Sequence, residues 1–376
     1  MIEASRLRKV FGSPPGGMVA VDDVSLRVEP GELFVVMGLS GSGKSTLLRM
    51  LNRLVEPTSG ALSVCGQDML ATTDAQLREV RNHKVNMVFQ HFALFPHRTV
   101  RENAAYGLRV RGLARSERLE RADWALRTVG LGDWGDSKPD ELSGGMRQRV
   151  GLARALATEA EVLLMDEPFS ALDPLIRREM QDLLISLQRD LKRTIVFVTH
   201  DLNEAMRMGD RIMVMRGGRV VQLGTPQDIL FSPADDYVSD FVSDVDRSRV
   251  LTADTVMQDV RVTAGAGDDP RHVLRLLAAH DAAGVYVLDD DGRILGVARD
   301  DLLAKAIDQP RLSLRECLCD DYDRAAPDTH LMDLFTQVGR HSVPLAVTDP
   351  DGRLLGVVPR AAVLSALAEP REAVHV

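Results

Sequence analysis

Cysteine and aromatic residues are scarce in this chain. Its three cysteines, Cys65, Cys317 and Cys319, form no C-x-x-C pair, so the sequence offers neither a zinc-binding spacing nor a disulfide framework. Aromatic residues make up only 4% of the chain, and no apolar run approaches the roughly 18 residues needed to cross a bilayer. Residues 1–6 lack the apolar core of a signal peptide. These absences predict a soluble, cytoplasmic protein with free thiols.

An excess of basic charge is also missing. The net charge is −9 over 376 residues. Residues 1–250 hold 34 acidic and 33 basic side chains, whereas residues 251–376 hold 21 and 13. A nucleic-acid-binding protein usually presents a basic face, so we expect no nucleic acid partner. The length predicts two or three domains.

A glycine-rich stretch lies between a predicted strand at 33–37 and a predicted helix at 47–51. In this context the turn brings backbone N–H groups together around phosphate oxygens, at the positive end of the helix dipole. The lysine of such a loop reaches the β- and γ-phosphates, and the next hydroxyl can bind Mg²⁺. The stretch is therefore a predicted nucleotide-binding P-loop, formed by Gly38, Leu39, Ser40, Gly41, Ser42, Gly43, Lys44, Ser45 and Thr46.

Two apolar runs, 162–165 and 194–199, read as buried parallel strands that end in polar residues. Since the carboxyl ends of parallel strands meet at one edge of a sheet, we expect Asp166 in the Mg²⁺ shell and Glu167 polarising the attacking water. His200 ends the second strand, which favours a functional histidine over a structural one. Asp173 is expected near the same site or across a dimer contact.

Gln90 and Phe11 are further candidates. Gln90 ends the apolar segment 85–89, and its amide oxygen could face Mg²⁺ or the attacking water. Phe11 stands among few aromatics. Its ring could stack on adenine or could simply be a half-buried strand residue, and the local pattern leaves both readings open.

A second helix start offers another anion site. Ser143, Gly144 and Gly145 precede the helical run 150–157, so a hydroxyl, free N–H groups and the helix dipole come together. Two such starts cannot easily serve one nucleotide within a single chain. A head-to-tail dimer would place each nucleotide between the P-loop of one copy and the second loop of the other.

The C-terminal third contains an internal repeat. Residues 291–297 recur as residues 351–357, sixty positions later. Each copy has an Asp-Gly hairpin turn and is followed by a predicted helix, over 300–307 and over 360–367. The predicted organisation is a first domain at 1–243, a charged linker at 244–250, and two repeats at 251–309 and 310–376.

The ordered set GLSGSGKS, Gln90, LSGGMRQR, LLMDEP, SALD and His200 resembles the ATP-binding cassette ATPases over about residues 1–240. The resemblance implies an α/β P-loop NTPase: a RecA-like core with an antiparallel β-layer and a helical subdomain. It implies that the chain binds ATP and Mg²⁺, with Glu167, His200 and Gln90 as catalytic residues. Met146 stands where many members carry Gln, which implies tuned rather than lost activity. By the same resemblance the metal residues are Ser45, Gln90 and Asp166, the adenine partner is Phe11, the signature that binds the partner's ATP is Ser143, Gly144 and Gly145, and the D-loop residue is Asp173.

The repeat resembles a pair of CBS modules, a Bateman domain of the α+β class. That family often binds adenine nucleotides through a Ser/Thr-x-x-Asp pattern after the second hairpin strand. Here the aligned positions are Arg299 with Leu302 and Pro359 with Ala362, so ordinary ribose recognition is not expected. A regulatory sensor and a plain dimerisation module both stay open.

End to end, the chain resembles the ATP-binding subunits of glycine betaine/L-proline (quaternary amine) importers. This implies a homodimer at the cytoplasmic face of the membrane that works with a permease and an extracellular substrate-binding protein. Residues 92–96 and the nearby helical region would hold the permease. Choline, an amino acid or another substrate remains the alternative.

The same resemblance implies that the CBS pair senses ionic strength, by salt-screened attraction to anionic lipid, or binds a cyclic dinucleotide. The acidic C-terminal third argues against simple attraction unless basic side chains gather on one face. The candidates for such a face are Arg271, Arg275, Arg311 and Arg315.

Overall fold

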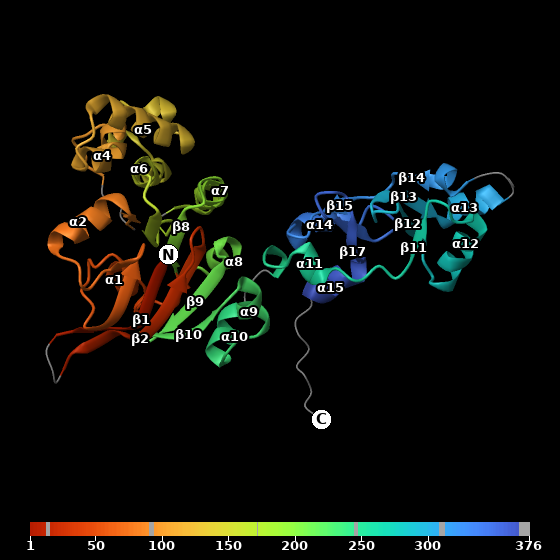
Figure 1. The fold of residues 1–376 in the computed structure, drawn as a ribbon, viewed down its shortest axis with the longest axis horizontal. Helices are drawn as coiled ribbons and strands as arrows, with labels where there is room; N and C mark the ends of the chain where they lie inside the picture. The colour runs from red at the N-terminus through yellow and green to blue at the C-terminus, as the bar shows by residue number, and fades with distance from the viewer. Residues whose placement is uncertain (13–15, 90–93, 171, 244–246, 308–312, 368–376) are drawn as a thin grey trace. The chain divides into compact units, whose positions relative to one another are not determined.

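The computed structural model describes residues 1–12, 16–89, 94–170, 172–243, 247–307 and 313–367. The chain divides into two units, Met1–Val245 and Asp246–Val376, and each is described by itself (Figure 1). In the described part of the chain, no helix is both long enough and apolar enough to cross a membrane.

Unit 1 is built on a six-stranded sheet with the order β10-β9-β3-β8-β7-β6. All its neighbours pair in parallel except β10, which runs antiparallel to β9 at one edge. Every residue of β3, β7 and β8 is buried, as expected for parallel strands covered on both faces. The strands are β3 (Leu33–Met37), β6 (Val85–Val88), β7 (Val162–Asp166), β8 (Thr194–Thr199), β9 (Arg211–Arg216) and β10 (Arg219–Gly224).

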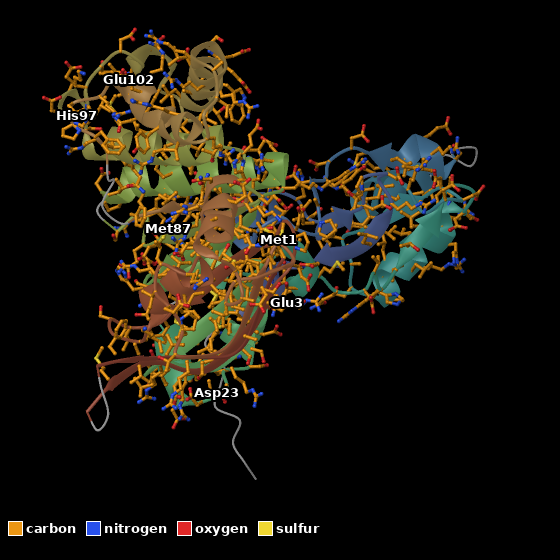
Figure 2. The ribbon with its side chains drawn as sticks, turned by 60° about the vertical axis from the view of Figure 1, so that its left-hand side comes forward. Met1, Glu3, Asp23, Met87, His97 and Glu102 are labelled. Carbon is orange, nitrogen blue, oxygen red and sulfur yellow. The ribbon has the colours of Figure 1, made fainter. Side chains whose placement is uncertain are left out.

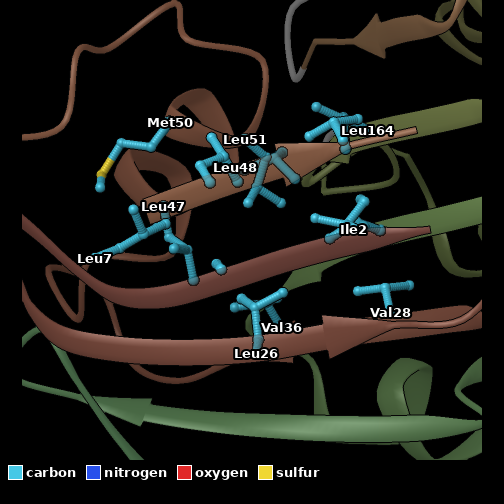
Figure 3. Packing of buried hydrophobic residues seen from close by; sticks show 14 of the residues in the cluster. Ile2, Leu7, Leu26, Val28, Val36, Leu47, Leu48, Met50, Leu51 and Leu164 are labelled. Atoms are coloured by element: carbon cyan, nitrogen blue, oxygen red, sulfur yellow. The ribbon is translucent and has the colours of Figure 1, made fainter. Parts of the chain in front are cut away.

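A second, antiparallel sheet has the order β2-β1-β4-β5. Its strands are β1 (Ile2–Phe11), β2 (Met18–Val28), β4 (Ser59–Val64) and β5 (Gln67–Asp68). Helix α1 (Lys44–Leu51) contributes four fully buried apolar side chains to one core with both sheets: Leu47, Leu48, Met50 and Leu51 (Figure 3). Burying each of them stabilises the fold by roughly 1.5–3 kcal/mol. This core fixes the start of α1 beside the carboxyl ends of β3 and β7.

The remaining helices of unit 1 form a helical group and a set that flanks the central sheet. The helical group holds α3 (Val100–Ala104), α4 (Tyr106–Val110), α5 (Arg115–Thr128), η1 (Gly132–Trp134), η2 (Pro139–Glu141) and α6 (Gly144–Ala157). The others are α2 (Asp74–His83), α7 (Pro174–Leu191), α8 (Leu202–Met208), α9 (Pro226–Phe231) and α10 (Asp236–Val242). Figure 2 shows His97 and Glu102 in the helical group, away from Glu3 and Asp23 on the antiparallel sheet.

Unit 2 contains the two repeats, each with the element order β-α-β-β-α. The first is β11 (Thr263–Gly265), α12 (Pro270–Ala279), β12 (Gly284–Leu288), β13 (Ile294–Arg299) and α13 (Asp300–Ile307). The second is β15 (Arg324–Ala325), α14 (Leu331–Val338), β16 (Leu345–Thr348), β17 (Leu354–Val358) and α15 (Arg360–Leu367). Short elements precede or join them: η3 (Arg247–Arg249), α11 (Ala253–Val256), η4 (Leu314–Cys317) and β14 (Leu318–Cys319).

The two hairpins of unit 2 have the same geometry and meet each other. The turn glycines, Gly292 and Gly352, have φ values of 80° and 81°, which a residue with a side chain rarely adopts. Arg293 and Arg353 form an antiparallel bridge between the repeats, and the Leu354 N–H donates to Gly292 O at 3.0 Å. Because the hairpins share backbone hydrogen bonds, the repeats pack as one body with a common apolar cluster: Tyr286, Ile294, Val297, Val343, Ala346 and Val357.

Candidate nucleotide-binding and hydrolysis site

The loop between β3 and α1 requires glycine at two positions. Gly38 and Gly43 have φ values of 147° and 98°. A Cβ atom on Gly38 would lie 2.2 Å from Met215 O, and one on Gly43 would lie 2.3 Å from Ala20 O. The backbone therefore passes so close to neighbouring strands that no larger residue fits.

Lys44 begins α1 and its side chain turns back over the loop. The buried ammonium donates hydrogen bonds to Gly38 O at 2.7 Å and to Leu39 O at 3.0 Å. Burial lowers the pKa of Lys44, while the negative charges of Glu167 and Asp166 oppose that effect. Both of its hydrogen-bond partners are neutral carbonyls, so the ammonium makes no direct ion pair in the loop and can bind an anion there.

Asp166, at the end of β7, is 2% exposed and is bound from α1 on both oxygens. The Ser45 hydroxyl donates to Oδ1 at 2.6 Å, and Arg49 Nη2 donates to Oδ2 at 3.1 Å. Ser45 and Arg49 are four residues apart, so they lie on one face of the helix. Arg49 is a site residue that none of the sequence motifs contains. The signal that identifies it is this i, i+4 spacing from the P-loop serine.

The donor set fits Mg²⁺ as it binds in nucleotide sites, where one or two carboxylates share the ion with phosphate oxygens and water. Ser45 and Asp166 supply a hydroxyl and a carboxylate within hydrogen-bond reach of each other. In the same loop, the buried Ser42 Oγ has no hydrogen-bond partner, which fits a loop built to receive a polar ligand. Among the described residues, no group of three or more His, Cys, Asp or Glu side chains is arranged to hold a metal.

Glu167 and His200 meet at the neighbouring strand ends. Glu167 Oε2 lies 3.1 Å from His200 Nδ1, with the glutamate 19% and the histidine 54% exposed. Strands β7 and β8 are paired so that Asp166 lies opposite Val198, which brings the residues after each strand together. Glu167 has a φ of 44°, a conformation that costs about 1–3 kcal/mol for a residue other than glycine. The fold holds this carboxylate in a strained position at the mouth of the site.

Comparison with known proteins finds relatives of both units of the chain. The ABC transporter family model matches residues 21–170, and the CBS domain model matches residues 247–308 and 320–369. The chain is 46% identical to the glycine betaine transport ATP-binding protein OpuAA of Bacillus subtilis over 100% of this chain and 89% of that protein. It is 46% identical to the glycine betaine/proline betaine transport system ATP-binding protein ProV of Salmonella typhimurium over 97% of each.

The chain belongs to the ABC transporter ATP-binding proteins. Its fold also matches a dimeric bacterial ABC transporter cassette, MJ0796, with a TM-score of 0.56 and 34% identity over 60% of this chain and 99% of that one. A related structure of that cassette is bound to ADP and Pi. The predicted fold class, an ABC ATPase followed by tandem CBS domains, is confirmed. ATP is accordingly the nucleotide of this ABC-type ATPase.

Two other predicted residues stand at different places in this ABC cassette, and a third lies outside the described residues. Phe11, at the end of β1, is 40% exposed, and Lys9 Nζ lies 4.9 Å from its ring centroid, so the ring is accessible. Asp173 caps the N-terminus of α7 by accepting from the Ile176 N–H at 3.1 Å. Gln90 lies outside the described residues, and so do residues 92 and 93 of the predicted permease contact.

The signature residues are not part of the P-loop cluster. Ser143 caps α6, and its hydroxyl accepts from the Met146 N–H at 3.3 Å. Figure 1 shows α6 in the helical group, whereas α1 lies against the strands. The start of α6 instead faces the first turn of α7, since a Cβ on Gly145 would lie 2.5 Å from Ile176 Cγ2. The signature and the D-loop therefore belong to one surface of the cassette.

The CBS pair contains a pocket of about 400 Å³ whose lining includes Arg261, His280, Tyr286 and Pro359. Pro359 stands where the family pattern has Ser or Thr, so this wall offers no hydroxyl. The Tyr286 hydroxyl donates a hydrogen bond to Pro344 O at 2.6 Å, and burial raises the pKa of Tyr286.

Of the four arginines considered for salt sensing, Arg271, Arg275 and Arg315 are exposed and Arg311 lies outside the described residues.

We expect Arg49→Gln to raise the Mg²⁺ concentration needed for half-maximal ATP hydrolysis by about tenfold, as loss of an outer-shell ligand partner commonly does. The physical reason is that Asp166 Oδ2 would lose its charged donor and the carboxylate would be free to turn. Binding of a fluorescent ATP analogue, titrated with Mg²⁺ and then in EDTA, checks this independently of turnover. Arg49→Lys is the control for charge without the guanidinium fork. Identical Mg²⁺ curves for Arg49→Gln and the native chain would contradict it.

Proposed function

We propose that this chain is the ATP-hydrolysing subunit of an importer for a compatible solute, glycine betaine, proline or a related quaternary amine. The observation that supports the proposal is the match to glycine betaine transport ATP-binding proteins along the whole chain, CBS pair included. An importer of choline, an amino acid or another substrate, with the CBS pair as a dimerisation module, is the second candidate. The ligand of the associated binding protein discriminates between them.

The geometry of the strand ends supports the following hydrolytic roles. The loop N–H groups and Lys44 bind the phosphates, because they present positive charge at the start of α1. Ser45 and Asp166, with Gln90, would hold Mg²⁺, which when bound would neutralise developing charge on the phosphates. Glu167 accepts a proton from the attacking water, and His200, held beside it at 3.1 Å, stabilises charge on the γ-phosphate. Catalysis then rests mainly on positioning and charge stabilisation.

We propose a head-to-tail dimer in which Ser143, Gly144 and Gly145 bind the nucleotide of the other copy. Two facts support it: the helix that these residues open, α6, lies in the helical group whereas α1 lies against the strands (Figure 1), and the similar cassette MJ0796 is dimeric. Gly145 lies close to Ile176, whose N–H donates to Asp173, which supports the proposal that the signature and the D-loop share one surface. In this arrangement both segments face the partner copy.

The assembly around this dimer includes a membrane permease and an extracellular substrate-binding protein, which puts the chain on the cytoplasmic face of the membrane. Its relatives are ATP-binding proteins of transport systems, which by name need other subunits. We also propose the domain boundaries 1–243, 251–309 and 310–376, with 244–250 as the linker. Residues 247–249 form η3, which contacts α14 and α15, so the linker's last part packs with the second repeat.

In the proposed importer the CBS pair regulates transport in response to ionic strength or a nucleotide. Arg271 and Arg275 lie one turn apart on α12, and both are exposed. Attraction of such a pair to an anionic surface weakens as salt shortens the Debye length. The missing hydroxyl at Pro359 makes recognition of an ordinary ribose the weaker reading.

The test is uptake of labelled glycine betaine at low and high osmolarity, in cells that lack this chain and carry either the native form or a variant. The native chain should restore glycine betaine uptake, and this uptake should increase with osmolarity. An Arg271→Gln/Arg275→Gln double variant should transport but respond less to osmolarity, because the salt-screened contact is lost. No uptake with native chain under any condition would reject the substrate class. An unchanged osmotic response of the double variant would reject the role of these arginines.

A further inference from the structure

Two loops that carry predicted functional residues open adjacent helices. Asp173 caps α7, and Asp201, directly after His200, caps α8 by accepting from the Asn203 N–H at 2.9 Å and the Glu204 N–H at 3.3 Å. Each helix thus starts beside one functional loop. Any rigid connection between the first turns of α7 and α8 connects the D-loop to the loop of His200.

Arg177, in the first turns of α7, makes such a connection. Its Nη2 donates to Leu172 O at 3.2 Å, next to Asp173, and its Nη1 donates to Asp201 Oδ2 at 3.3 Å, next to His200. The guanidinium is planar and presents its donors in a fixed fork. One rigid group therefore holds the backbone of the D-loop and the residue that follows His200.

Glu204 completes the connection from α8. It is 5% exposed, accepts from the Thr199 hydroxyl at 2.6 Å and from Gln181 Nε2 at 3.1 Å, and lies 3.8 Å from Arg177 Nε. Thr199 directly precedes His200, and its hydroxyl oxygen also accepts from the Asp201 N–H at 3.0 Å. Gln181 lies one turn beyond Arg177 on α7.

Burying a charged member of this cluster, Glu204, costs free energy. Desolvation raises the pKa of Glu204, and the Thr199 hydrogen bond, the Arg177 charge and the Gln181 hydrogen bond act against that rise. Glu204 is the buried charged member, so removing Arg177 or Gln181 would take away a partner that offsets its desolvation. Because they share these hydrogen bonds and charges, the side chains of Thr199, Asp201, Arg177 and Glu204 restrict one another's motion.

We propose that Arg177 and Glu204 are positioning residues that hold the D-loop and the loop of His200 in a fixed arrangement. A contact that Asp173 makes then sets the orientation of His200. The proposal rests on the proposed dimer, in which Asp173 faces the other copy. The structure supplies the link within one copy: Leu172 O to Arg177 to Asp201, and Arg177 to Glu204 to Thr199. Nucleotide at one site then biases His200 at the other.

The first measurement is amide hydrogen exchange on the full chain without nucleotide. Glu204→Gln should speed exchange at the start of α7, residues 172–177, by about tenfold, although the substitution lies on α8. Arg177→Gln should do the same for residues 199–204. The matched control is Arg178→Gln, because Arg178 is the next residue on α7 and is exposed. It should leave both segments unchanged.

The second measurement is steady-state ATP hydrolysis by the same variants. We expect Arg177→Gln and Glu204→Gln to lower kcat by about 10- to 100-fold, as misplacement of a catalytic group does. KM should stay within about twofold, because the P-loop is untouched. Positive cooperativity in ATP should fall toward a Hill coefficient of about 1, since the two sites would no longer be coupled. Arg177→Lys, which keeps the charge but not the fork, should recover little.

Three outcomes would overturn the proposal. The first is unchanged exchange in the opposite segment for both variants, and the second is an equal effect of Arg178→Gln. A lower unfolding temperature with kcat per folded protein and the Hill coefficient unchanged would also reject it, because the cluster would then serve stability alone. If native chain hydrolyses no ATP, the proposed function fails, while the exchange measurement still decides whether the two loops are locked together.

Discussion

Glu167→Gln stops ATP hydrolysis while ATP binding remains. We expect kcat to fall by about 10²- to 10⁴-fold, the usual contribution of a general base. The amide keeps the size of the side chain and can still contact His200, which lies 3.1 Å away, but it cannot take a proton from water. The P-loop and Lys44 are unchanged, so a fluorescent ATP analogue should bind with the native Kd. Phosphate release and analogue binding, measured on the same sample, check both parts.

The matched control for this result is Glu120→Gln, an exposed glutamate on α5, which should hydrolyse ATP at the native rate. The Glu167→Gln variant should also lengthen the lifetime of the ATP-bound dimer, because hydrolysis would no longer separate the copies. Size-exclusion chromatography with ATP reports this directly. Turnover by Glu167→Gln within about twofold of native would remove Glu167 from the base role.

The second large effect is expected for Gly43→Ala. The new Cβ would lie 2.3 Å from Ala20 O at a φ of 98°, so both a backbone clash and a disfavoured conformation arise. We expect a loss of roughly 2–4 kcal/mol in the free energy of unfolding. We also expect loss of nucleotide binding, because Gly43 caps α1 and any shift moves the N–H groups that receive phosphate. Chemical unfolding and analogue binding measure the two effects.

Gly41→Ala separates the clash from the conformational preference. Gly41 has a φ of 80°, but a Cβ atom added there would meet no other atom within 4 Å, so only the backbone term of about 1 kcal/mol applies. Its nucleotide affinity should fall much less than that of Gly43→Ala. Equal losses in the two variants would show that the close approach to Ala20 does not matter.

Much of the candidate site could be predicted from the sequence because its parts stand at the ends of strands. The glycine-rich loop, Asp166 with Glu167, and His200 each follow an apolar run typical of a buried parallel strand, and parallel strands end at one edge of their sheet. The hairpins of unit 2 were predictable for a similar local reason, since Asp-Gly at 291–292 and 351–352 favours a tight turn. In these cases the local sequence is enough to predict where each residue lies in its sheet or hairpin.

Only the tertiary structure decided which side chains meet across elements. The pairing of Arg49 with Asp166 depends on how α1 packs beside β7, and the Arg177–Glu204 cluster depends on how α7 packs against α8. Glu167, with its positive φ, donates its N–H to Val198 O on β8, and the Arg293–Arg353 bridge depends on the packing of two repeats. Such contacts join residues far apart in sequence, and their free energy comes from burial and hydrogen bonding that no local pattern encodes. The sequence by itself determined the chemistry of the site, and packing determined the contacts that orient it.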